Sequence, residues 1–164
     1  MKEKTEIFRS PTKGKMELAK VAREISDYIG KDSENKYRLI VGTDSNGCEK
    51  ADFVTAIIVC RVGRGGRYFW KKTNGGKIYH TLRDRIYQEV TLSLKTAQDI
   101  LGQLETTVKA SQPSYDFQIH IDVGQNGPTR EMIKEVVGMV RGNGFDAKIK
   151  PESYAASNIA DKYI

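Results

Sequence analysis

The sequence predicts an α/β domain built on a mixed sheet of five strands with helices on its faces. Three apolar segments first follow one another with connections of hairpin length, which is typical of an antiparallel meander. Helical and strand-like periodicity then alternate, and strands separated by helices join a sheet in parallel through right-handed crossovers. With 164 residues, 38% of them hydrophobic, the chain is long enough for one such domain.

The N-terminal segment is predicted to be an arm followed by a helix. Residues 1–14 show no clear periodicity, whereas apolar residues recur at helical spacing over 15–29. We therefore expect residues 1–36 to form an N-terminal arm and helix, packed on a domain that spans 37–164.

The three meander strands are predicted over 37–41, 53–62 and 68–73. The middle strand is nearly all apolar, as expected of a central strand that is covered on both faces. Asp44 follows the first strand almost directly, so a carboxylate is expected where that strand ends.

Helices and strands alternate in the second half of the chain. A long helix with an apolar stripe comes first, and the strand after it runs through Asp122 near its end. Parallel neighbours bring the ends of the first and fourth strands to the same edge, where α/β folds place their ligands. The predicted elements are a helix over 81–104, a strand over 117–123, a helix over 129–141, a strand over 147–150 and a helix over 155–163.

The positive charge of the chain is concentrated in one segment. The net charge is +6, and residues 61–87 carry eight basic side chains against one acidic one. Such a segment attracts polyanions such as nucleic acids, although a solvated basic face is an alternative interpretation. The candidate contacts to a phosphate backbone or base are Arg64, Arg67, Trp70, Lys71, Lys72 and Lys77.

Four acidic residues are candidates for a shared site. Asp44 and Asp122 stand at the ends of predicted neighbouring strands, Glu89 falls on or beside the buried stripe of the long helix, and Asp161 lies on the last helix. Each also has an ordinary alternative role. The two strand-end aspartates can form turns, Glu89 can pair with Arg85 on the helix surface, and Asp161 can be a solvated acid. Their joint placement favours a common site.

Oxygen ligands without cysteine select Mg²⁺ or Mn²⁺ if these acids converge. Two such ions about 4 Å apart would clamp the attacking and leaving oxygens of a phosphodiester. His120 lies two residues from Asp122 and would orient water or a leaving group, while the alternative is a buried structural histidine.

Four segments of the chain resemble the ribonuclease H-like superfamily and, within it, the small YkuK-type bacterial proteins. The resemblance spans roughly residues 37–163 and implies the strand order 3-2-1-4-5 with strand 2 antiparallel, to which this chain adds an N-terminal helix. The segments that carry the resemblance are Ile40-Val-Gly-Thr-Asp-Ser45, Leu82-Arg-Asp-Arg-Ile-Tyr-Gln-Glu89, Ile119-His-Ile-Asp-Val-Gly124 and Lys150-Pro-Glu-Ser-Tyr-Ala-Ala-Ser-Asn-Ile-Ala-Asp161.

The resemblance implies an acidic set of defined places. One acid stands on the first strand, one on the first long helix, one at the end of the fourth strand and one on or before the last helix. Matched by motif, these places are Asp44, Glu89, Asp122 and Asp161, with Glu152 as a rival for the last. Asp44 would then bridge two metal ions, Glu89 and Asp122 would hold one or both, and Asp161 would complete the second site.

The expected function is therefore metal-dependent hydrolysis of RNA, DNA or a hybrid. A non-catalytic nucleic-acid-binding module on the same fold is the alternative, because a fold alone does not imply activity. A nucleotide-dependent phosphotransfer enzyme is a third possibility, but the chain is short for the paired domains of such enzymes. No apolar run approaches the length of a membrane span and the N-terminus shows no signal core, so we expect a cytoplasmic protein without a membrane partner.

Overall fold

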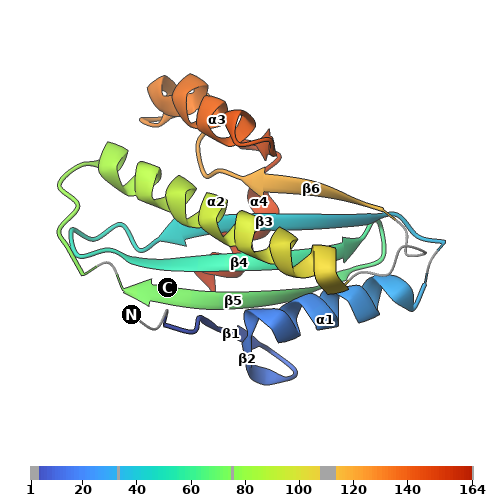
Figure 1. Ribbon diagram of the computed structural model, residues 1–164. Helices are drawn as coiled ribbons and strands as arrows, with labels where there is room; N and C mark the ends of the chain where they lie inside the picture. The colour runs from blue at the N-terminus through green and yellow to red at the C-terminus, as the bar shows by residue number, and fades with distance from the viewer. Residues whose placement is uncertain (1–3, 33, 75, 108–113, 164) are drawn as a thin grey trace.

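The computed structural model describes residues 4–32, 34–74, 76–107 and 114–163, which form a single mixed sheet with helices on both faces (Figure 1). The sheet has seven strands in the order β2-β1-β5-β4-β3-β6-β7. Strands β3 to β5 form the predicted antiparallel meander, while β6 pairs with β3 in parallel and β7 pairs with β6 in parallel. The strands are β1 (Ile7–Ser10), β2 (Gly14–Glu17), β3 (Tyr37–Ser45), β4 (Asp52–Arg61), β5 (Gly66–Asn74), β6 (Tyr115–His120) and β7 (Asp146–Lys148).

The helices lie in two layers. The long helix α2 and the N-terminal helix α1 cover one face of the sheet, and α4 covers the opposite face (Figure 1). Helix α3 follows a short 3-10 turn and packs against β7 and α2. The bounds are α1 (Leu18–Gly30), α2 (Leu82–Thr107), the 3-10 turn η1 (Arg130–Met132), α3 (Ile133–Gly142) and α4 (Tyr154–Asp161).

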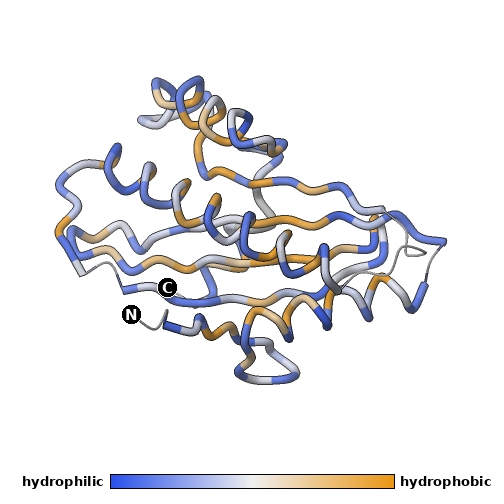
Figure 2. Tube along the Cα trace, viewed as in Figure 1, coloured by the Kyte–Doolittle hydropathy of each residue, from blue (hydrophilic) through white to orange (hydrophobic). Residues whose placement is uncertain are grey.

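Alternation along β3 divides its side chains between these layers. Leu39 and Val41 point into the main core under α1 and α2, whereas Ile40 contributes to a smaller cluster under α4. Strand β4 is buried along most of its length because both of its faces are covered, which confirms the prediction for the nearly all-apolar segment. Figure 2 shows the same concentration of hydrophobic residues along the central strands.

The prediction of five strands was wrong because residues 1–14 do not form only an arm. Strands β1 and β2 make a hairpin whose first strand pairs with β5, and α1 accordingly begins at Leu18 rather than at residue 15. Each hairpin strand buries one large apolar side chain, Phe8 or Met16, in the main core. A single buried residue in a four-residue strand leaves no periodic signal in the sequence.

The five predicted strands occupy consecutive places, β5-β4-β3-β6-β7, within the longer sheet. Their ends differ from the prediction by a few residues. Strand β6 ends at His120, so Asp122 lies just beyond it rather than within it. In the part of the chain that the structure describes, no helix is both long and apolar enough to cross a membrane.

Candidate functional site

The two predicted strand-end aspartates come together at one edge of the sheet. Strands β3 and β6 are parallel neighbours, and their last paired residues are Gly42 and His120. Asp44 and Asp122 each follow two residues later, so the shared register carries both to the same level. The negative charge of Asp122 is among the causes that raise the pKa of Asp44, which reflects how close the two carboxylates lie.

Helix α4 adds a third acid from the opposite face to α2. Its last residue, Asp161, makes a side-chain hydrogen bond with Asp44. Glu152, the rival for this place, is exposed in the turn before α4, where its backbone N–H donates to the carbonyl of Ile149 at 2.8 Å. The acid that meets Asp44 is therefore Asp161.

Glu89 reaches the same edge from α2. Its side chain is 5% exposed, and the hydroxyl Oγ of Ser45 donates to Glu89 Oε1 at 2.7 Å. The backbone N–H of Ser45 donates to Asp44 Oδ1 at 2.8 Å, so this one residue links two of the four carboxylates. The alternative of a surface pair with Arg85 does not describe this geometry, because Arg85 Nη1 donates to the carbonyl of Gly47 at 2.6 Å.

Burial and the crowding of like charges raise the pKa values of two carboxylates in this cluster. Burial, the charge of Asp122 and the hydrogen bond with Asp161 raise the pKa of Asp44 to about 7. Burial above all, followed by the charges of Asp44 and Asp122, raises the pKa of Glu89 to about 8, although the hydrogen bond from Ser45 opposes the change. The cluster therefore holds protons near neutral pH unless a cation binds to it.

The cluster also contains a lysine that no sequence pattern indicates. Lys150 Nζ lies 2.8 Å from Asp122 Oδ1, just beyond β7. Its hydrogen bond to Asp122 and the charges of Asp44 and Glu89 raise the pKa of the ammonium group. Lys150 opens the last segment that resembles the superfamily, but no periodicity connects it with Asp122, because the contact depends on how the chain leaves β7.

The donor chemistry of the cluster fits Mg²⁺ or Mn²⁺, since all four acids offer carboxylate oxygens. Within the described residues, however, no three acidic, histidine or cysteine side chains already stand in an arrangement that would hold a metal ion. The crevice between Thr43, Glu89 and Asp122 has no room for a water molecule. Metal binding therefore requires these side chains to move, and Asp122 in particular to exchange its partner Lys150.

His120 fits the alternative of a structural histidine. It is buried, and its Nε2 atom lies 3.1 Å from Gln118 Oε1. Burial, together with the positive charges of Arg38 and Lys148, lowers the pKa of His120 to about 4. The ring is neutral at physiological pH, and protonating it would be costly.

The basic segment does not form one surface. Trp70 and Lys72 lie on the Asp44 face of the sheet, because Asp44, Val54 and Lys72 are aligned across β3, β4 and β5. Lys71 points to the opposite face, where it is buried and its Nζ lies 2.7 Å from Glu6 Oε1. A phosphate contact through Lys71 stays a prediction, and its burial and its pairing with Glu6 do not favour it.

The other predicted contacts are dispersed. Arg64 is exposed in the turn between β4 and β5, and Arg67 lies over the ring of Tyr28, 5.6 Å from its centroid. Lys77 follows the opposite end of β5 and lies over the ring of Tyr79. Strand β5 thus separates Arg64 from Lys77 by its whole length.

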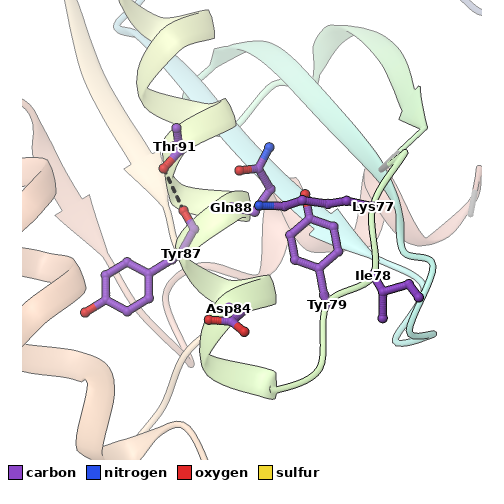
Figure 3. A pocket seen from close by; sticks show the side chains of 7 residues that line it. All are labelled: Lys77, Ile78, Tyr79, Asp84, Tyr87, Gln88 and Thr91. Carbon is purple, nitrogen blue, oxygen red and sulfur yellow. Dashed lines mark hydrogen bonds between the residues drawn. The ribbon is translucent and has the colours of Figure 1, made fainter.

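A surface pocket of about 260 Å³ lies beside the first half of α2 (Figure 3). Lys77 and Asp84 bring opposite charges to it, and Tyr79 and Gln88 are among the other lining residues. None of the four clustered acids lines this pocket. Its lining of mixed charge and polarity does not favour one class of ligand. The carboxylates are therefore the stronger candidate for a functional site.

The arrangement defines a class of protein. Acids at the ends of two parallel central strands, with further acids from helices on opposite faces, place the chain among proteins of the ribonuclease H type. The chain belongs to the ribonuclease H-like family, which matches residues 20–164. Within that family it is of the YkuK type: the uncharacterised protein YkuK of Bacillus subtilis (strain 168) is 30% identical over 165 residues, which cover 96% of each chain. No solved structure matches the chain.

Proposed function

We propose that this protein is a metal-dependent nuclease that hydrolyses phosphodiester bonds at the carboxylate cluster. The observation that supports the proposal most strongly is the convergence of four acids, Asp44 from β3, Glu89 from α2, Asp122 from the segment after β6 and Asp161 from α4. Acids that crowd together, with Glu89 buried and Asp44 half-buried, are costly unless a cation balances them. Such an arrangement is expected at a functional site rather than in a structural core.

Each carboxylate has a distinct part in the proposal. Bound divalent cations would activate water and stabilise the charge that develops on the attacking and leaving oxygens. Asp44 interacts with both Asp122 and Asp161 and would hold a cation together with them, and Glu89, whose pKa the charge of Asp44 also raises, would join them from α2. Ser45 orients two of these groups through its backbone N–H and its hydroxyl.

The α4 face of the sheet supports a nucleic acid as the substrate. Lys72 lies two strands from Asp44 in register, roughly 10 Å away at the usual strand spacing. Trp70 lies on the same face and stacks on Tyr163, with ring centroids 3.9 Å apart, while the guanidinium of Arg9 lies 5.6 Å from the Trp70 ring. Cations beside aromatic rings suit a nucleic-acid strand, because backbone phosphates and bases then both find partners.

A cleavage assay on an RNA–DNA hybrid, on duplex DNA and on single-stranded RNA, each with Mn²⁺ or Mg²⁺, tests the proposal. We expect cleavage by the wild type and its loss in Asp44→Asn, which keeps the shape of the side chain. Asp99→Asn is the matched control, because Asp99 lies on α2 away from the cluster and approaches Lys95. Cleavage that persists in Asp44→Asn would contradict the proposal.

The non-catalytic nucleic-acid-binding module is the second candidate. It is favoured by one observation, the occupation of Asp122 by Lys150, which leaves no metal-holding arrangement among the described side chains. Such a module would bind the same nucleic acids with equal affinity in Mn²⁺ and in EDTA, and it would cleave none of them. A fluorescence-anisotropy titration in both buffers separates the two candidates.

A further inference from the structure

Among the described residues, the ion pair between Lys150 and Asp122 is a contact of the carboxylate cluster that takes no part in the proposed chemistry. Lys150 Nζ lies 2.8 Å from Asp122 Oδ1. The negative charges of Asp44 and Glu89 also stabilise the protonated ammonium group. A positive charge therefore already stands where four carboxylates converge.

The backbone holds Lys150 in this place. Its N–H donates to the carbonyl of Val123 at 2.9 Å, next to Asp122 in the chain. The side chain then passes over Gly124, where an added Cβ would come within 3.0 Å of Lys150 Cβ. The absence of a side chain at Gly124 thus leaves the room that the lysine stem occupies.

The Lys150–Asp122 ion pair is exposed enough for its partners to exchange. The side chains of Lys150 and Asp122 are 55% and 24% exposed, so water can replace either partner. The contrast is the pair between Lys71 and Glu6, in which the lysine is buried beside the ring of Phe8. An exposed lysine can swing away on its flexible stem when another cation takes its carboxylate.

We propose that Lys150 is a positioning residue that acts as a built-in competitor of the metal ion: it holds Asp122 in the metal-free protein, and a divalent cation must displace it from that carboxylate. This inference rests on the proposed function, because it assumes that Asp122 is a metal ligand. Two cations at one carboxylate repel each other, so the lysine weakens metal binding. In the metal-free protein, its positive charge reduces the repulsion among the acids.

Calorimetric titration of the full chain with MnCl₂ tests this. Lys150→Met removes the positive charge but keeps an unbranched side chain over Gly124. We expect Mn²⁺ to bind this variant roughly tenfold more tightly than the wild type, because a nearby, partly screened positive charge has been removed. Lys150→Arg keeps the charge and should bind Mn²⁺ as the wild type does. Lys20→Met, on the exposed side of α1, is the control for net charge.

The possible results distinguish the inference from the proposed function. Binding to the wild type with equal or weaker affinity in Lys150→Met would overturn the role of Lys150 and leave the metal site standing. No binding to any of the proteins would overturn both. Circular dichroism of each variant shows whether it is folded, and if Lys150→Met is unfolded, Lys150→Gln takes its place in the same comparison.

Discussion

Replacing Glu89 by Gln should stabilise the metal-free protein at pH 8 and change little at pH 5. The glutamate is 5% exposed, and in the native protein its pKa is raised from 4.5 to about 8. Glutamine has nearly the same shape and retains the oxygen that accepts the hydrogen bond from Ser45. The substitution therefore removes the ionisable group while preserving the packing around it.

The raised pKa sets the size and the sign of the effect. Between pH 4.5 and pH 8 the unfolded chain has released the Glu89 proton while the native protein still holds it, so stability falls as the pH rises through this window. At about 1.4 kcal/mol per pH unit the loss approaches roughly 4 kcal/mol at pH 8. Glutamine does not titrate, so Glu89→Gln escapes this loss and should melt on the order of 10 °C higher than the wild type at pH 8.

Thermal unfolding followed by circular dichroism at pH 5, 6.5 and 8 in EDTA measures the difference. Titrating groups that do not interact with Glu89, including His120, are common to both proteins and cancel in the comparison. Glu105→Gln, at an exposed position of the same helix, is the control and should follow the wild type at each pH. Parallel pH profiles for Glu89→Gln and the wild type would refute the interpretation that Glu89 is a buried acid with a raised pKa.

Two further substitutions test the surfaces around the site. Lys71→Met should lower the free energy of unfolding by about 2 kcal/mol, because it leaves Glu6 without its buried partner. Urea unfolding measures this loss. A lower affinity of the variant for nucleic acid would contradict the internal role of Lys71. Trp70→Phe should weaken binding of single-stranded nucleic acid several-fold in a filter-binding assay, because the smaller ring stacks over less area. Tyr28→Phe, on the α1 side, should leave that affinity unchanged, and an equal loss in both variants would argue against a specific surface beside Trp70.

The carboxylates could be predicted from the sequence because each has a local signal. Asp44 follows the apolar part of a predicted strand, Asp122 stands near the end of another, and Glu89 falls on or beside an apolar stripe where a carboxylate needs a partner. Parallel pairing of two strands is enough to bring the two aspartates to one edge. Nothing in this inference depends on detailed side-chain packing.

The contacts that could not be predicted join elements whose relative placement is fixed only by the folded core. Lys150 meets Asp122 because the chain leaving β7 crosses the end of β6. The direction of Lys71 was also open, since charge alone does not say which face of β5 a basic residue occupies. The terminal hairpin could not be predicted because each of its four-residue strands buries only one large apolar side chain, Phe8 or Met16.

Diffraction from crystals soaked in MnCl₂, recorded at a wavelength where manganese scatters anomalously, tests the central claim most directly. We expect an anomalous peak beside Asp44 and Asp122, with the Lys150 side chain turned away from Asp122. A cluster that keeps the Lys150–Asp122 pair and shows no peak at saturating Mn²⁺, with or without a bound oligonucleotide, would contradict a metal-dependent nuclease.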